Sequence, residues 1–195
     1  MARVEPLERP DLSELKPLLD AVEHSVGFVP NSMLTMARWP VLVRGFAALA
    51  KPILEPGRLS RELKQLVALV SSAAAGCRYC QAHTSHSAAH AGAAAEKIQA
   101  VWEFEPSPLF SPREKAALRL AKDAGVTPNQ VEEEHFEELR RYFDDDEIVE
   151  IVAVISLFGF LNRWNDTLAT SLENGPRSYA EDTLTSTGWS VGKHR

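Results

Sequence analysis

Cysteine is scarce in this chain of 195 residues, which contains two in all. Two thiols cannot supply the disulfide framework of a small secreted protein, so we expect a reducing, cytoplasmic setting. Residues 1–10 are charged and lack the apolar stretch of a secretory signal, which argues against export. The longest apolar segment, residues 148–161, is interrupted by Glu150 and is shorter than the roughly 18 residues that indicate a membrane span. We therefore expect no membrane partner.

The chain also lacks a long basic run, and its formal net charge is −6. This balance argues against nucleic acid or anionic lipid as a partner. A hydrophobic fraction of 45% with 25% charged residues is typical of a globular protein. No segment shows the strict alternation of apolar and polar residues that marks a half-buried strand. The sequence therefore predicts an all-α fold.

Apolar residues recur at helical spacing along most of the chain, and Ser, Pro and Gly mark where helices begin and end. We expect one helical domain over residues 1–175 and a tail over residues 176–195 that adds no core. Trp189 is the exception in that tail, because it could dock on the body of the protein or on a neighbouring subunit, or lie in a disordered end. The expected helices span residues 11–23, 32–38, 40–54, 61–76, 77–91, 112–124, 128–143 and 145–173.

Two parts of the chain resemble each other when the sequence is shifted by 85 residues, which aligns Glu62–Cys80 with Glu147–Asn165 without a gap. Two buried helices would share some of this match by chance, but polar residues match as well as apolar ones, which favours a duplication. The first copy covers about residues 60–92 and the second about 145–173. Because asparagines replace both cysteines in the second copy, we expect only the first copy to be active. Identical pairs are Glu62/Glu147, Val67/Val152, Ala68/Ala153, Ser71/Ser156 and Arg78/Arg163.

The two cysteines are Cys77 and Cys80, and they form a C-x-x-C motif just after Gly76. On a helix the second cysteine lies one turn after the first, so a disulfide can open and close with little backbone movement. If Gly76 breaks the chain, Cys77 lies in the first helical turn, where unpaired N–H groups and the helix dipole favour a thiolate. His83 lies roughly 60° from Cys80 on the helical wheel and is our candidate base.

Glu62 is the candidate carboxylate for a proton relay, and it precedes Cys80 by 18 residues. On one straight helix the two residues would lie about 27 Å apart, so contact requires the chain to fold back near Gly76. The alternative is that Glu62 complements the dipole at the start of its helix. His86 points about 120° away from Cys80 and is a surface or packing candidate. A zinc site made by the cysteines and two histidines is disfavoured, because one helix cannot easily surround a metal with four ligands.

The segments RELKQLVALVSSAAAGCRYCQAH (61–83) and DEIVEIVAVISLFGFLNRWND (146–166) resemble the carboxymuconolactone decarboxylase and AhpD-like superfamily, in its alkylhydroperoxidase branch. The resemblance covers most of the chain. It implies an AhpD-like helical bundle with an internal repeat that forms a homo-oligomer, as a dimer, trimer or hexamer. It also implies a thiol-dependent peroxidase or disulfide reductase in which a cysteine pair works with a glutamate and a histidine. We expect the enzyme to need no cofactor and no metal.

In the family scheme the second cysteine is oxidised by a peroxide and the first resolves it to a disulfide, which a dithiol such as a lipoyl group reduces. Carried over, Cys80 would be peroxidatic, whereas the helix dipole favours Cys77. The sequence departs from the family pattern at three positions. The family histidine falls on Thr84, one residue after His83. The relay glutamate falls on Gln65, a turn after Glu62, and the histidine between the cysteines of some members is Tyr79 here.

The catalytic residues that we predict are therefore Cys77, Cys80, His83 and Glu62, with Gln65 and His86 as alternatives in the relay. The expected activity is reduction of alkyl or hydrogen peroxides through the cysteine pair. Two alternatives remain at this stage. One is a lactone decarboxylase or isomerase, as in the branch of the superfamily that lacks the cysteine pair. The other is a non-catalytic oligomeric module whose thiols sense redox state.

Overall fold

The computed structural model describes residues 2–195, and in that range the chain is helical with no β-strand, which confirms the all-α prediction. Three short 3-10 segments join the α-helices: η1 (Arg9–Leu15), η2 (Ala100–Glu103) and η3 (Thr185–Thr187). The α-helices are α1 (Lys16–Val26), α2 (Asn31–Met36), α3 (Pro40–Leu54), α4 (Arg61–Ala74), α5 (Arg78–His90), α6 (Ala95–Gln99), α7 (Pro112–Gly125), α8 (Glu133–Leu139), α9 (Asp145–Leu168) and α10 (Asn174–Leu184).

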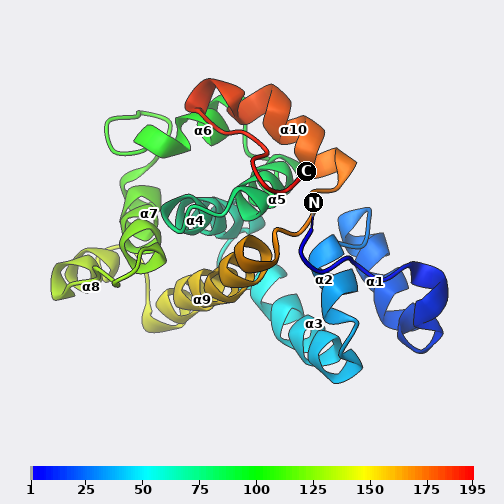
Figure 1. Cartoon of the computed structure of the whole chain (residues 1–195). Coiled ribbons are helices and arrows are strands. Elements are labelled where there is room, and N and C mark those ends of the chain that lie inside the picture. Colours follow the sequence, from blue (N-terminus) through cyan, green and yellow to red (C-terminus); the bar gives the residue numbers. More distant parts are fainter. Residues whose placement is uncertain (1) are drawn as a thin grey trace.

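Helix α4 lies at the centre of the main core, surrounded by α5, α7 and α9 (Figure 1). The Ser60 side chain caps its first turn by accepting from the backbone N–H of Leu63, as the serine before an apolar run predicts. From Leu63 to Ser72 every side chain is buried, so this helix is covered all round rather than along one stripe. Both cysteines belong to the same hydrophobic cluster.

A second, smaller cluster lies beside the first, where α1, α2 and α3 pack together. Leu161 and Trp164 of α9 pack against this small cluster, and Leu161 also packs against the main core. Helix α9 therefore ties the N-terminal helices to the rest of the protein. Figure 1 shows these N-terminal helices to one side of the α4–α5 pair.

Several predicted helix bounds agree with the structure, and others are wrong. Helix α3 spans residues 40–54 as predicted. The predicted helix over 128–143 is wrong over much of its length, since α8 covers only Glu133–Leu139. The long final helix ends at Leu168 rather than near Glu173, because Ala169 adopts a left-handed conformation with φ of 50°. Helices α6 and α10 were not predicted.

The expectation that residues after Pro176 add no core is wrong. Helix α10 continues through this region and packs on α5, and Leu184 and Trp189 join the main core. The segment that follows, Trp189–Arg195, is called the C-terminal segment below. Its Trp189 indole N–H donates to the carbonyl of Arg78 at 3.1 Å, and the backbone N–H of Leu172 donates to the carbonyl of His194 at 2.9 Å. Trp189 therefore docks on the body of this same chain.

The two similar sequence segments adopt different shapes. Residues 62–80 are divided between α4 and the start of α5, whereas residues 147–165 all lie on the continuous helix α9. Among residues 2–195, no helix is both long enough and apolar enough to cross a bilayer.

Candidate functional site

The cysteine pair lies at the turn between α4 and α5. Gly76 has a φ of +73°, a left-handed conformation that glycine adopts without strain, and it ends the α4 helix as expected. The backbone N–H of Cys77 then donates to the carbonyl of Ser72 at 3.1 Å, which closes the turn. Cys77 becomes the N-cap residue of α5, and α5 runs back along α4 (Figure 1). The break therefore places Cys77 at the helix start and Cys80 in the first turn.

Both cysteines are free thiols with almost no exposed surface. Hydrogen bonding from the Cys80 thiol lowers the pKa of Cys77 against the opposing effect of burial, and the backbone N–H groups of Cys80 and Tyr79 add to the lowering. Burial raises the pKa of Cys80 well above its ordinary value, and the hydrogen bond to Cys77 raises it further. Cys77 is therefore the more acidic thiol, in agreement with the argument from the helix start and opposite to the family order.

The sulfur of Cys80 also contacts the second sequence repeat. The side-chain amide of Asn165 on α9 donates to Cys80 Sγ at 3.5 Å, and Asn165 is the residue that aligns with Cys80 in the shifted copy. The oxygen of this amide is buried without a hydrogen-bond partner, as are both side-chain polar atoms of Asn162, which aligns with Cys77. The segment that aligns with the cysteine motif therefore supplies one polar contact to Cys80, through Asn165.

His83 binds a carboxylate that the sequence analysis missed. Its Nε2 lies 2.6 Å from Glu173 Oε2, and the Tyr79 hydroxyl donates to Glu173 Oε1 at 2.9 Å. The rings of His83 and Tyr79 stack with their centroids 4.4 Å apart. Burial alone would raise the pKa of Glu173, but the charge and hydrogen bond of His83, with a further hydrogen bond from the backbone N–H of Asn31, hold that pKa below its ordinary value. His83 is therefore held by Glu173.

Glu173 can reach this position because α9 ends early. It is the N-cap residue of α10 in an extended conformation, and it lies in the short connection after Leu168. The sequence pattern placed Glu173 at the end of a long helix, where its carboxylate would have faced elsewhere. The asparagine, glycine and proline that follow it were a helix-end signal, but they did not indicate which residue would face His83.

Glu62 lies at the opposite end of α4 from the cysteines. Its carboxylate accepts from Lys97 Nζ at 2.9 Å, and the same ammonium group donates to Glu114 at 2.5 Å. Although α5 folds back along α4, the twelve residues from Glu62 to the end of that helix span about 18 Å, so the fold-back does not bring Glu62 to the sulfurs. Glu62 thus belongs to an ion-pair cluster with Lys97.

The alternatives for the relay have other contacts. Gln65 is buried in α4 and the Thr84 hydroxyl donates to the backbone carbonyl of Cys80 at 2.7 Å. The rings of His86 and His90 lie 4.3 Å apart towards the far end of α5. Burial lowers the pKa of His86, and the neighbouring His90 and His83 lower it further.

A third group of side chains meets Cys77 on its other side. Potential ligand atoms of Cys77, Asp166 and His194 all lie within 4.8 Å of one another. They come from the start of α5, the end of α9 and the C-terminal segment. Neither Asp166 nor His194 was singled out by the sequence analysis, because each lies far from the cysteines in the chain.

The same three residues are the one group of potential metal ligands found among residues 2–195, and the histidines of α5 do not form such a group with the cysteines. A metal ion would have three protein donors here. One of them, Asp166, already pairs with Lys193 at 2.7 Å. Three protein donors are too few for a structural zinc site, which has four, and equal the number in a catalytic zinc site, so the donor count alone does not separate ion binding from proton transfer.

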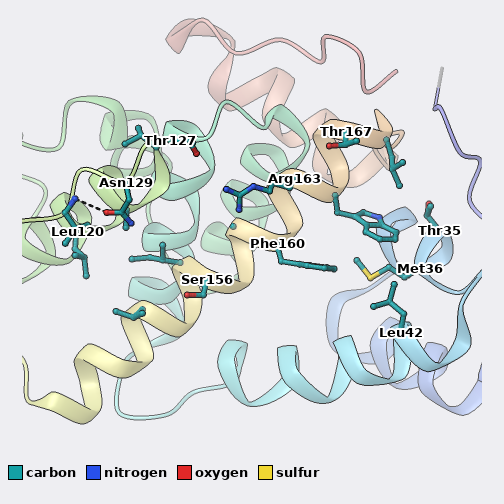
Figure 2. Close-up of a pocket in the computed structure, with 18 of the residues that line it drawn as sticks. Thr35, Met36, Leu42, Leu120, Thr127, Asn129, Ser156, Phe160, Arg163 and Thr167 are labelled. Carbon is teal, nitrogen blue, oxygen red and sulfur yellow. Dashed lines mark hydrogen bonds between the residues drawn. The ribbon is translucent and has the colours of Figure 1, made fainter.

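A hollow on the surface lies apart from the cysteines. It is an open groove of about 1460 Å³ that runs along the outer face of α9, between α2 and α3 on one side and α7 and α8 on the other (Figure 2). Phe160 and Arg163 of α9 point into it, and Trp39 on its rim is 63% exposed. The buried cysteines face the opposite side of α9, where Asn165 lies. The groove and the thiols are therefore separate features.

Comparison with known proteins places this site in a family. The model of the carboxymuconolactone decarboxylase family matches residues 40–123. The uncharacterized protein YnjA of Escherichia coli is 34% identical over 92 residues, which cover 47% of this chain and 50% of YnjA. The chain thus matches about half the length of that curated relative.

Solved structures match nearly the whole chain. The debrominase Bmp8 is 38% identical, with a TM-score of 0.84 over 92% of this chain and 97% of Bmp8. A cysteine-to-alanine variant of Bmp8 has been solved in complex with 2,3,4-tribromopyrrole. An alkylhydroperoxidase AhpD core protein, a peroxidase-related protein from Ralstonia eutropha, is 24% identical with a TM-score of 0.77 over 89% of this chain and 94% of that one, and it supports the fold alone. The chain therefore belongs to the carboxymuconolactone decarboxylase family, whose model covers both cysteines, and it shares its fold with an AhpD-like protein.

Proposed function

We propose that this protein is a dithiol oxidoreductase in which Cys77 attacks a small electrophilic substrate and Cys80 resolves the product to a disulfide. The observation that carries the proposal is the pair of buried free thiols at the start of α5, in which the pKa of Cys77 is lowered and that of Cys80 is raised. This asymmetry gives one thiol the character of a nucleophile and keeps the other protonated until it is needed.

A peroxide is the first substrate class that we propose. The Cys77 thiolate would attack one peroxide oxygen, so that an S–O bond forms, the O–O bond breaks and the alcohol leaves with a proton. The Cys80 sulfur would then attack the sulfur of Cys77, forming the S–S bond and releasing water. The peroxide gains two electrons and the two thiols lose them. A dithiol, such as a reduced lipoyl group, would restore the pair by thiol–disulfide exchange.

The test is peroxide consumption with dihydrolipoamide as the added reductant, in the natural protein and in the Cys77→Ser and Cys80→Ser variants. We expect both substitutions to abolish multiple turnover. In Cys80→Ser, one equivalent of peroxide should leave a sulfenic acid on Cys77 that dimedone traps and mass spectrometry locates. A trapped sulfenic acid on Cys80 of the Cys77→Ser variant, together with none on Cys77 of the Cys80→Ser variant, would reverse the assigned order.

The same experiment separates the enzyme from the alternatives. A redox-sensing module would be oxidised stoichiometrically without repeated turnover. A lactone decarboxylase or isomerase would need neither thiol, so both serine variants would keep its activity. Unchanged peroxide consumption in both serine variants would remove the dithiol proposal.

Reductive dehalogenation is a second candidate, which the similarity to the debrominase Bmp8 favours. In that reaction the two thiols would again supply two electrons: the C–Br bond breaks, bromide leaves, the ring carbon gains a proton and the cysteines form a disulfide. The experiment is incubation with 2,3,4-tribromopyrrole and a dithiol, with bromide release measured by ion chromatography. Release that requires both cysteines would support a dehalogenase, and peroxide turnover without bromide release would support a peroxidase.

Substrate access follows from the burial of the pair. Because Cys77 has no exposed surface, a substrate can reach its sulfur only when a covering segment moves. The C-terminal segment supplies His194 beside that sulfur, so its opening is the movement that we propose. Assembly into a homo-oligomer remains a prediction.

A further inference from the structure

His194 is a buried histidine with one nitrogen satisfied and the other free. Its side chain is 1% exposed, and Nδ1 lies 2.8 Å from the backbone carbonyl oxygen of Thr170. A carbonyl can only accept, so Nδ1 carries the hydrogen and the neutral ring keeps its lone pair on Nε2. That Nε2 is buried without a hydrogen-bond partner. A buried acceptor without a donor is costly and indicates that something fills the role in another state.

The imidazole of His194 lies beside Cys77 and Asp166. A ring nitrogen of His194, Cys77 Sγ and an Asp166 carboxylate oxygen all lie within 4.8 Å of one another. Nε2 lies 3.8 Å from Asp166 Oδ1. No hydrogen bond joins Nε2 to the sulfur, and proton-transfer pairs in proteins without substrate commonly form theirs only when the substrate binds. The carboxylate is placed to stabilise positive charge on the imidazole.

We propose that His194 accepts the proton of Cys77 and that Asp166 stabilises the imidazolium so formed. This assignment rests on the proposed function, in which Cys77 is the attacking thiol. The S–H bond of Cys77 breaks and an N–H bond forms at His194 Nε2, leaving a thiolate. When the thiolate attacks a peroxide, the leaving alkoxide takes that proton back from Nε2. The histidine therefore returns to its neutral form in each cycle, and the electrons come from the two thiols.

The charges around His194 agree with a base that is neutral at rest. Burial lowers the pKa of His194, against the raising effects of the Thr170 carbonyl and of Asp166, so the ring is uncharged at neutral pH. The titratable and charged groups that face it come from three elements: Cys77 and Tyr79 at the start of α5, Asp166 on α9, and Lys193 in its own segment.

The other histidine near the pair is already engaged. His83 Nε2 lies against Glu173, and its ring stacks on Tyr79. A histidine whose Nε2 is occupied by a carboxylate is a weaker candidate for the proton of Cys77 than one whose Nε2 is free. The His83–Glu173 pair is therefore better placed to hold the start of α5 in position than to ionise Cys77.

The experiment measures the ionisation of Cys77 directly. Iodoacetamide alkylation of Cys77 is followed by mass spectrometry between pH 6 and 9 in the natural protein and in His194→Gln and Asp166→Asn. His24→Gln is the matched control, because His24 is exposed on α1. The readout is the slope of the rate against pH. Accessibility multiplies the rate equally at every pH, so a looser C-terminal segment does not change the slope.

With His194 as the proton acceptor, the rate of Cys77 alkylation should change little from pH 7 to 8 in the natural protein and in His24→Gln. In His194→Gln the alkylation rate should rise several-fold over that unit, because the thiol must then lose its proton to solvent. Asp166→Asn should lie between the two. A slope in His194→Gln equal to that of the natural protein would overturn the proposal.

A second experiment guards against loss of folding. In His194→Ala, added imidazole should restore the flat alkylation profile and, where a substrate turns over, raise a rate that is depressed about 10²-fold. The His24→Ala control should not respond. Failure of imidazole to change either quantity would refute the role of His194. So would suppression of Cys77 alkylation by Zn²⁺ in the natural protein and not in His194→Ala, because that result would indicate a metal ligand. A shifted profile without turnover on any substrate would leave the proton acceptor in place and remove the proposed function.

Discussion

Replacing Trp189 with alanine should loosen the C-terminal segment and expose Cys77. The indole is 5% exposed, belongs to the main core and donates to the carbonyl of Arg78, the residue after Cys77. Truncation of a buried tryptophan to alanine costs about 3–5 kcal/mol, including the cavity that remains. If that cost falls on the docking of the segment, the population of opened molecules rises by at least roughly 10²-fold, since 1.4 kcal/mol is a factor of ten.

The assay is the labelling rate of Cys77 with an aromatic disulfide reagent at constant pH and low reagent excess. When closing is faster than labelling, the rate follows the population of open molecules, so Trp189→Ala should react roughly 10²-fold faster than the natural protein. The control is Trp39→Ala, because Trp39 is 63% exposed on the rim of the groove and its loss should leave the rate unchanged. Mass spectrometry identifies which cysteine carries the label.

Urea separates local opening from global unfolding. Opening of the segment exposes little surface, so the labelling rate should depend weakly on urea while the unfolding transition itself stays steep. Equal labelling of Cys77 and Cys80 with the steep urea dependence of global unfolding would refute a local opening. Unchanged labelling in Trp189→Ala would refute the idea that the segment covers the sulfur.

Three further predictions concern stability and the relay. Glu150→Gln should lower the free energy of unfolding by about 3 kcal/mol in urea titrations, because the ammonium group of the fully buried Lys64, 2.9 Å from Glu150, would lose its counter-charge; a loss below 1 kcal/mol would contradict this. Glu62→Gln should keep Cys77 labelling and peroxide turnover within about twofold, as expected for an exchange within a partly exposed ion-pair cluster; a large loss of turnover would return Glu62 to the relay. Burial lowers the pKa of His194 below the value of about 6.5 that it has in the unfolded chain, so its contribution to the free energy of unfolding should be fully present above pH 6.5 and should decrease as the pH falls below it. His194→Gln should flatten this decrease between pH 7 and 5.5 in urea titrations. An equally steep decrease in the variant would exclude this cause.

Local features of the sequence predicted the part of the site that depends on neighbouring residues. Periodicity and capping residues gave most of the helices, and Gly76 between an apolar helix and Cys77 indicated the break correctly. The position of Cys77 at a helix start followed from that break. These features could be predicted because each depends on residues within one or two helical turns.

The rest of the site is made by contacts between distant segments, which the pattern of one chain does not encode. Glu173 lies 90 residues after His83, and its position depends on α9 ending at Leu168 through a left-handed alanine that no propensity rule predicts. His194 lies in a polar stretch that resembles a disordered end. Trp189 was the one residue of that stretch that suggested packing on the body of the protein. It did not indicate that His194 would lie beside Cys77.

The position of His194 has a practical consequence for anyone who makes this protein. A purification handle or fusion partner attached after Arg195 would begin two residues beyond His194, which is itself buried beside a thiol. Such an appendage would have to leave from a closely packed corner of the molecule, where the carbonyl of Arg195 accepts from the Ser171 hydroxyl. A handle removed by a protease before assay would leave these contacts undisturbed.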